Sequence, residues 1–322
     1  MRSEPDISVV IPTRDRVDAV SRVLGALSEQ DVDAGRMEVL VVDNGSRDGT
    51  VKRLRGEASA LPYRLRVLDQ PRSGASAARN TGIAAAEADL ILFLGDDTPP
   101  AGAGLVAGHV RAHGERSDPW RAVMGLSSWA PTVQVTSVME WLERTGRSHD
   151  YRGLEREATR LPVLYSNNVS LWRRALVEVD GFDERFPQYG WEDYDLALRL
   201  WEHGFNVAFR PELLVHHEHH YELPDSLRRM EAVGRTANLL NRLHESRGSL
   251  DAPRPAGPKA VLGRMVSPFI YRVPVPQWLP APARDQAYRL LHFGAICRGY
   301  FAEPLPADRS LRGGVGAAEP AT

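Results

Sequence analysis

The segment Ala88-Asp-Leu-Ile-Leu-Phe-Leu-Gly-Asp-Asp97 is an apolar run that ends in two adjacent carboxylates. The unbroken apolar stretch from Leu90 to Leu94 is typical of a strand buried on both faces of a parallel sheet. Functional groups of such sheets gather outside the carboxyl ends of the strands. Asp96 and Asp97 are therefore expected at the mouth of a cleft, where their repulsion favours a bound cation or hydrogen-bond donors. The alternative is a solvated turn, because Gly-Asp-Asp-Thr-Pro-Pro is also good loop chemistry.

Strand-like and helix-like segments alternate along the first hundred residues. Buried strands are expected at residues 7–12, 39–42, 63–69 and 90–94. Helices are expected at residues 16–27 and 76–87, with a short one that begins at Thr50. Alternation at this spacing indicates βαβ units. The predicted fold class is α/β, with a Rossmann-type, mostly parallel sheet flanked by helices.

The second part of the chain is less regular. Further strands are expected at 122–127, 163–171, 205–209 and 212–215, and helices at 192–203, 226–247 and 284–301. From Asp251 to the last of these helices, proline density rises and the regular pattern stops. The final residues are small and polar, so a disordered tail is expected at 312–322.

Composition limits the class of protein. The formal net charge of −2 gives no general basicity for binding nucleic acid. A single cysteine, Cys297, excludes an internal disulfide and fits a reducing cytoplasm. We see no apolar signal region before the first strand, and no apolar run near the ~20 residues of a membrane-spanning helix. A cytoplasmic protein is expected, at most peripheral to the inner face of a membrane.

Polar residues also follow the other predicted strands. Ile11-Pro-Thr-Arg-Asp-Arg16 lacks the GxGxxG pattern, and no P-loop occurs, which disfavours hydride transfer and ordinary nucleoside triphosphate hydrolysis. Asp43 could accept hydrogen bonds from a base or ribose, although Asp-Asn-Gly is itself a strong turn sequence. Arg79, within the small-residue segment 74–82, could face a phosphate or a base edge, or simply be an exposed helical arginine.

Five motifs in order, VVIPTRDR, VLVVDNGSRDGT, GASAARNTGI, ILFLGDD and GFDERFPQYGWEDYDLALRL, resemble glycosyltransferase family 2 with its GT-A fold. The resemblance implies inverting transfer of a sugar from a nucleoside diphosphate donor to an acceptor hydroxyl, with Mn²⁺ or Mg²⁺. The donor would be UDP-, dTDP- or GDP-linked, and the acceptor a lipid-linked or natural-product glycan in polysaccharide or glycoconjugate biosynthesis. Residues 1–220 would be the catalytic domain, with a nucleotide-sugar-binding half at 1–100, an acceptor-side half at 101–220, and a helical, Pro-rich extension at 221–311.

The resemblance also assigns residues to the nucleoside. It places Pro12, Thr13 and Asp43 at the nucleobase, with Arg79 nearby and Asp96 at the ribose. Arg14 belongs to the same binding segment, at a position where relatives commonly carry an aromatic residue.

The metal is assigned in the same way, to Asp97. A cation bridging the diphosphate would stabilise the charge that accumulates as the donor bond breaks, and hard oxygen ligands suit such a cation. Gly95 stands where many relatives carry the first acid of a DxD motif, so metal binding within this motif depends on Asp97.

Trp191-Glu-Asp-Tyr-Asp195 opens a predicted helix. By the resemblance, Asp193 is the general base that takes the proton from the acceptor hydroxyl, and Glu192 positions acceptor or donor. A carboxylate suits the role because the hydroxyl acidifies only as it attacks. The alternative is that both acids merely stabilise the helix dipole in a first turn.

The cluster His216-His-Glu-His-His220 follows a predicted strand. In some related enzymes a histidine at this place is an extra metal ligand; His217 is the first candidate and His216 the next. A neutral imidazole would complement Asp97 on Mn²⁺. The alternative is a surface loop, since neighbouring strand residues alternate faces.

Basic and aromatic residues are interleaved at 259–300. This composition could lay a surface on anionic lipid. The favoured interpretation is a cap on the catalytic core whose arginine stems cover apolar surface.

Two other functions remain open. A sugar-phosphate nucleotidyltransferase also uses a parallel sheet and a carboxylate-bound metal. A catalytically inactive sugar-nucleotide-binding protein is the non-enzymatic alternative, favoured only by Gly95. The fold alone does not separate these, so the site residues decide.

Overall fold

The computed structural model describes residues 4–71, 74–114, 118–154, 156, 159, 162–187, 189–245, 250 and 252–305. The tail expected at 312–322 lies outside these ranges.

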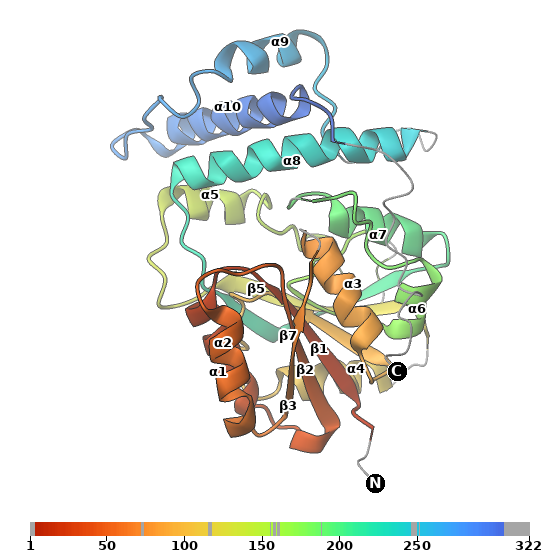
Figure 1. The fold of residues 1–322 in the computed structure, drawn as a ribbon. Coiled ribbons are helices and arrows are strands. Elements are labelled where there is room, and N and C mark those ends of the chain that lie inside the picture. The colour runs from red at the N-terminus through yellow and green to blue at the C-terminus, as the bar shows by residue number, and fades with distance from the viewer. Residues whose placement is uncertain are drawn as a thin grey trace.

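A seven-stranded sheet forms the centre of the molecule, in the order β3-β2-β1-β4-β6-β5-β7 (Figure 1). The strands are β1 (Ile7–Thr13), β2 (Met37–Asp43), β3 (Arg64–Asp69), β4 (Leu90–Leu94), β5 (Arg121–Trp129), β6 (Asn168–Trp172) and β7 (Asn206–His217). The antiparallel strand is β6, and the other pairings are parallel. The predicted α/β class with a mostly parallel sheet is confirmed.

The described chain also forms helices, six of which cover the two faces of this sheet. They are α1 (Val17–Ser28), α2 (Thr50–Glu57), α3 (Ala75–Ala85), α4 (Leu105–Gly114), α5 (Ser137–Arg144), α6 (Arg173–Glu178), α7 (Glu192–Trp201), α8 (Leu223–Leu243), α9 (Gly257–Val266) and α10 (Ala281–Tyr300). Side chains of α1, α2 and α4 share one apolar core with the sheet, and those of α3, α6 and α7 share the other. β1, β2 and β4 contribute alternate residues to both cores, so their central residues are apolar apart from the buried Ser8 and Glu38.

The structure differs from the predicted elements in several places, among them α4, α5 and α6, for which no helix was expected. Residues 163–167, expected to be strand, precede β6. The two short strands expected around residues 205–215 are one strand, β7, whose pairing with β5 shifts register after Gly125. A ten-residue helix, α9, lies where no regular element was expected, because proline occupies its first turn, a position that proline tolerates.

The C-terminal extension is a helical layer at one end of the molecule (Figure 1), where α10 packs along α8. Glycines bring these two helices together. A Cβ on Gly299 would lie 1.9 Å from the carbonyl oxygen of Glu231, and one on Gly234 would lie 2.2 Å from that of Ile296. The helical C-terminal part expected from the sequence is present, and its helices α8 and α10 pack closely on each other.

Gly299→Ala is expected to lower the free energy of unfolding by about 1–3 kcal/mol, because the added methyl group overpacks a backbone contact. Chemical denaturation measures this. Gly56→Ala in α2 is the matched control, since nothing lies within 4 Å of the added Cβ, and we expect it to be neutral or slightly stabilising. Equal effects of the two substitutions would contradict close packing of α8 on α10.

Candidate active site

Sheet direction brings the predicted site residues to one edge. The parallel strands β1 and β4 end there at Thr13 and Leu94. Because β6 runs the opposite way, its beginning lies at the same edge, and Gly95 donates a backbone hydrogen bond to Asn167 just before β6. This edge is the carboxyl end of the parallel strands, where ligands of α/β sheets bind.

A cavity of about 980 Å³ opens at this edge. Most of the predicted site residues line it: Pro12, Thr13, Arg14, Arg79, Asp96, Asp97, Glu192, Asp193 and His217. Asp43 does not line this cavity. Its carboxylate accepts the backbone N–H groups of Gly45 and Ser46 at 3.1 and 3.0 Å, as in a side-chain-capped turn, and the neighbouring Asn44 lines the cavity instead.

The two adjacent carboxylates, Asp96 and Asp97, both bind the guanidinium group of Arg16. Arg16 Nη1 lies 3.1 Å from Asp96 Oδ1 and 2.6 Å from Asp97 Oδ2, and the Thr13 hydroxyl donates to Asp96 Oδ2 at 2.8 Å. Burial and repulsion from Asp97 raise the pKa of Asp96 to about 6. The pair therefore needs positive charge nearby when both groups are ionised.

Two histidines of the His216–His220 cluster reach Asp97. Its Oδ2 lies 3.6 Å from His217 Nε2 and 3.4 Å from His219 Nδ1. Burial opposes ionisation of Asp97, but contacts with both histidines and the charge of Arg16 hold its pKa well below the usual range. His216, the second candidate ligand, makes no such contact among the described residues. Residues two apart on an extended chain point to the same face. This spacing in the sequence could have indicated that His219 lies beside His217.

Backbone hydrogen bonds hold the histidines there. Glu218 N–H donates to Asp97 O at 2.8 Å, and His216 N–H donates to Pro99 O at 2.9 Å. The end of β7 is thus fixed against the segment that follows β4.

The donor set fits a divalent cation. One carboxylate and two imidazoles suit Mn²⁺. A six-coordinate ion with ligands near 2.1 Å needs its ligand atoms about 3 Å apart, so the separations of 3.4 and 3.6 Å from Asp97 Oδ2 would have to shorten around it. Within the described ranges, no three His, Cys, Asp or Glu side chains are placed so that together they could hold a metal ion as they stand. A Cβ on Gly95 would lie 3.1 Å from Asp97 Oδ1 and 3.0 Å from Thr98 Oγ1, so this turn is packed around a glycine.

The first turn of α7 places two acids, Glu192 and Asp193, on the cavity wall. Asp193 Oδ2 accepts the Ser166 backbone N–H at 2.9 Å, whereas Oδ1 is buried and has no hydrogen-bond partner among the residues described. An unpaired carboxylate oxygen on a cavity wall is able to accept a proton from a ligand.

Glu192 is held more tightly than Asp193. It accepts the Gly190 N–H at 2.8 Å, and its Oε1 lies 3.6 Å from Arg79 Nη1. Burial and the charge of Asp193 raise the pKa of Glu192 to about 7. Arg79 thus faces Glu192, and its Nε and Nη1 atoms make no hydrogen bond within the described structure.

The C-terminal extension supplies part of the cavity wall. Arg229 of α8 lines it together with Met230, Val233 and Ile296. The Arg229 guanidinium lies 3.6 Å from the Tyr189 ring centre and bonds the Tyr221 hydroxyl. Sequence reasoning missed Arg16, Arg229 and His219, and it set the extension apart from the catalytic domain.

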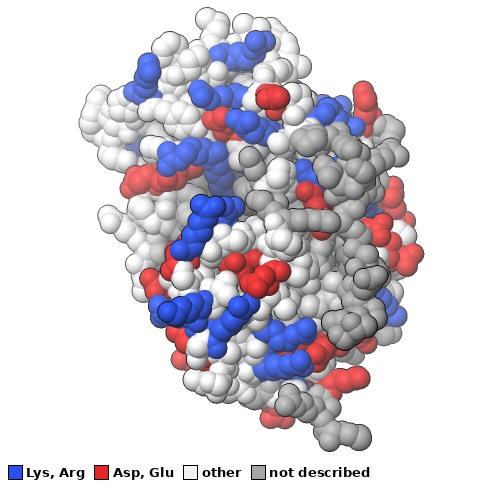
Figure 2. Space-filling view, in the orientation of Figure 1, with Lys and Arg blue, Asp and Glu red and all other residues white. Residues whose placement is uncertain are grey.

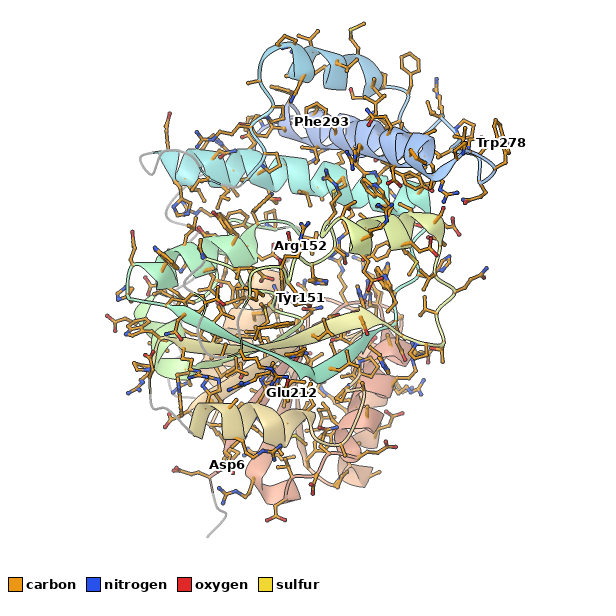
Figure 3. All side chains as sticks on the ribbon, turned by 180° about the vertical axis from the view of Figure 1, so that it is seen from behind. Asp6, Tyr151, Arg152, Glu212, Trp278 and Phe293 are labelled. Carbon is orange, nitrogen blue, oxygen red and sulfur yellow. The ribbon has the colours of Figure 1, made fainter. Side chains whose placement is uncertain are left out.

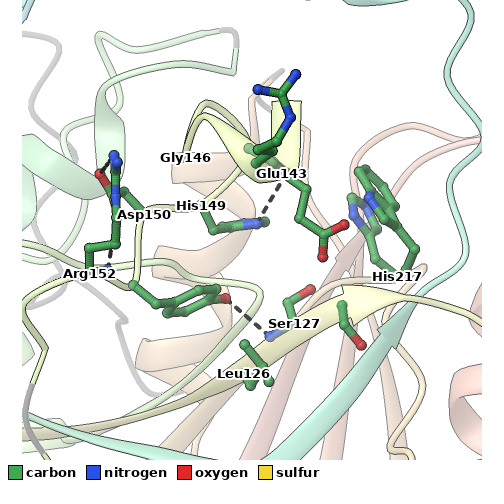
Figure 4. Close-up of a pocket in the computed structure, with 13 residues that line it drawn as sticks. Leu126, Ser127, Glu143, Gly146, His149, Asp150, Arg152 and His217 are labelled. Atoms are coloured by element: carbon green, nitrogen blue, oxygen red, sulfur yellow. Dashed lines mark hydrogen bonds and ion pairs between the residues drawn. The ribbon is translucent and has the colours of Figure 1, made fainter. Parts of the chain in front are cut away.

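A second cavity, of about 360 Å³, adjoins the first (Figure 4). The two share a wall that includes His149, Asp150 and His217. Trp129 lines the smaller cavity and stacks on His217, with ring centres 5.1 Å apart. Ser127 Oγ on its wall is buried without a hydrogen-bond partner among the described side chains, so a polar ligand has a group to bind there.

Comparison with known proteins agrees with this geometry. Residues 8–157 match the glycosyl transferase family 2 model, and residues 159–223 match the model described as N-terminal domain of galactosyltransferase. The chain is 32% identical over 247 residues to the Pre-mycofactocin glycosyltransferase of Mycobacterium tuberculosis, covering 73% of the chain and 47% of that protein. It is 30% identical over 233 residues to the Validoxylamine A glucosyltransferase of Streptomyces hygroscopicus subsp. jinggangensis, covering 65% and 54%. The chain spans about half the length of these relatives.

Solved structures share the fold. The Mannosyltransferase PcManGT from Pyrobaculum calidifontis, in complex with GDP-Man and Mn²⁺, matches with a TM-score of 0.62 and 17% identity over 94% of this chain and 89% of that one. Staphylococcus aureus TarS 1-349 matches with a TM-score of 0.54 and 18% identity over 92% and 89%. The chain therefore belongs to glycosyltransferase family 2 and has its GT-A fold.

Proposed function

We propose that this protein is a metal-dependent, inverting glycosyltransferase that moves a sugar from a nucleoside diphosphate to an acceptor hydroxyl. The observation that carries the proposal is that Asp97, with two imidazoles beside it, and the unpaired Asp193 Oδ1 lie on the walls of one cavity. A group that handles the leaving diphosphate and a base for the nucleophile are the two parts that inverting transfer requires.

Asp193 is the base in this proposal. Its Oδ2 is occupied by the Ser166 N–H, so Oδ1 takes the proton of the acceptor hydroxyl as that oxygen attacks the anomeric carbon. Glu192 and Arg79 stand beside it as a buried pair and hold the donor in position. Burial keeps water from competing with the acceptor.

Asp97, His217 and His219 would hold the Mn²⁺ or Mg²⁺. The cation supplies Lewis-acid stabilisation of the diphosphate oxygens. Arg16 and Arg229 also line the cavity and add positive charge there. Arg16, which binds Asp96 and Asp97 in the structure, could instead bind the oxygens of the diphosphate when the donor enters.

The nucleoside is expected against Pro12, Thr13, Arg14 and Asn44, which line the cavity at the ends of β1 and β2. The comparison structures contain GDP-Man and UDP-GlcNAc, which supports a nucleotide-sugar donor and leaves the base open. Asp96 remains the residue proposed at the ribose, since it is buried at the same strand end.

The acceptor is proposed to enter through the smaller cavity. Figure 4 shows Glu143, His149 and His217 around it, and Arg152 is already paired with Asp150. Burial lowers the pKa of His149 to about 3, so that wall carries a neutral imidazole. Glu143 is the carboxylate there without a partner in the described structure, which favours hydroxylated or amine-bearing acceptors over anionic ones.

Product analysis tests the proposal. The protein is incubated with UDP-, GDP- and dTDP-sugars and Mn²⁺. We expect the sugars linked to one of these nucleoside diphosphates to be used, so that this nucleoside diphosphate is released. Release of pyrophosphate from a nucleoside triphosphate and a sugar 1-phosphate would instead identify a nucleotidyltransferase. Tight donor binding with no release on any acceptor would identify an inactive binding protein.

A further inference from the structure

Helix α9 presents an apolar stripe to solvent. Its buried residues, Ala260 and Gly263, are small, and a Cβ on Gly263 would contact Cys297 of α10. Val261, Leu262 and Met265 are 59%, 50% and 67% exposed. At the rotation of an α-helix these three lie opposite the buried pair. The helix thus packs inward with small side chains and turns its large apolar ones outward.

The connection from α9 to α10 continues this feature. Phe269, Val273 and Trp278 are 54%, 44% and 80% exposed. Trp278 projects from the outer end of the helical layer (Figure 3). The six exposed apolar residues of α9 and this connection are named the apical surface: Val261, Leu262, Met265, Phe269, Val273 and Trp278. An apolar surface of this kind marks an interaction site.

The surroundings of the apical surface are basic. Residues 257–301 contain Lys259, Arg264, Arg272, Arg284, Arg289 and Arg298, and Asp285 is their single acid. Arg144 of α5 already binds the Asp285 carboxylate at 2.8 Å. Blue side chains are correspondingly frequent over the helical end of the molecule (Figure 2). Arg298 pairs with Glu231 of α8 at 3.1 Å. The other basic side chains of this segment have no acidic partner among the described residues.

An apolar stripe flanked by basic residues, with an exposed tryptophan, is the composition of a segment that lies in a lipid interface. No described helix is long and apolar enough to cross a membrane, so such a segment would lie on the surface. A second copy of this chain fits less well, because apposing two apical surfaces would bring two basic sets together. We propose that the apical surface docks on the anionic headgroup face of a lipid bilayer.

Docking would turn the helical layer toward the membrane. The same helical layer that carries the apical surface contributes Arg229 and Ile296 to the cavity wall. The docking proposal does not depend on the reaction, because its test measures binding of the protein alone.

Sedimentation with vesicles tests it. We expect the full chain to pellet with vesicles that contain phosphatidylglycerol, to remain in solution with phosphatidylcholine alone, and to be released by high salt. Met265→Glu and Trp278→Ala should each weaken partitioning by about tenfold, because they remove apolar insertion. Lys259→Glu should weaken it by a similar factor through charge.

Matched substitutions are available as controls. Trp201→Ala removes an exposed tryptophan at the end of α7, and Lys52→Glu reverses an exposed charge of α2; neither residue belongs to α9 or to the connection that follows it. Both should bind vesicles within about twofold of the unsubstituted protein. The proposal is overturned if the protein ignores anionic vesicles at low salt, or if Met265→Glu and Trp201→Ala behave alike. It is also overturned if ultracentrifugation shows a dimer that Met265→Glu converts to monomer.

Discussion

Asp193→Asn is expected to lower the rate of sugar transfer by about 10²–10⁴-fold, the usual scale for loss of a general base. The amide oxygen of the new side chain retains the hydrogen bond from Ser166 N–H, so the first turn of α7 keeps its position. The amide nitrogen then takes the place of Oδ1 and cannot accept the acceptor proton. Steady-state kinetics with a saturating donor measures the loss.

Donor binding should survive this substitution. Asp97 and the ends of β1 and β4 are untouched, so a nucleoside diphosphate with Mn²⁺ should stabilise Asp193→Asn as much as the unsubstituted protein. Asp89→Asn, an exposed acid just before β4, is the control and should keep full turnover. Turnover of Asp193→Asn within about threefold of normal would remove Asp193 from the mechanism.

The sequence was sufficient to place the candidate site residues that belong to short contiguous motifs at the ends of strands and helices. The apolar run at 90–94 is buried on both faces because β4 is a central strand of a sheet whose two faces carry separate apolar cores, and the end of β4 puts Asp96 and Asp97 at the sheet edge. The first-turn acids of α7 likewise reach the cavity. In both cases the backbone direction of one element fixes where its terminal side chains lie.

Site residues whose orientation depends on tertiary packing could not be predicted from the sequence. Arg229 is one of several arginines in α8, and only the packing of that helix against Tyr189 and Tyr221 turns it toward the cavity. Arg16 was expected only as the first residue of a helix, yet its guanidinium contacts both Asp96 and Asp97. Asp43 shows the opposite case, because its turn chemistry engages the carboxylate that had been expected at the nucleobase.

The helix α9 was missed for a different reason. Its length is ten residues, its flanks are rich in proline, and its apolar stripe faces outward. A pattern method expects the large apolar residues of a helix to face a core. The outward orientation of the large apolar residues is what makes the surface of α9 a candidate for docking.

Asp97→Ala is expected to abolish the part of donor binding that depends on metal. A nucleoside diphosphate at 100 times its dissociation constant should stabilise the unsubstituted protein by about 2.7 kcal/mol, a shift that thermal unfolding resolves. The shift should require Mn²⁺ and disappear with a chelator. In Asp97→Ala the two imidazoles remain without their carboxylate, so Mn²⁺ should add nothing to the effect of the nucleotide.

The substitution need not unfold the protein, which keeps the measurement interpretable. Asp97 is one of two repelling carboxylates, and Arg16 still has Asp96 as its partner when Asp97 is removed. Asp69→Ala is the matched control, because Asp69 ends β3 at the same edge of the sheet but is exposed and paired with Arg55. It should retain the full metal-dependent shift. An unchanged metal-dependent shift in Asp97→Ala would place the cation elsewhere, whereas its loss there and not in Asp69→Ala would tie the cation to Asp97.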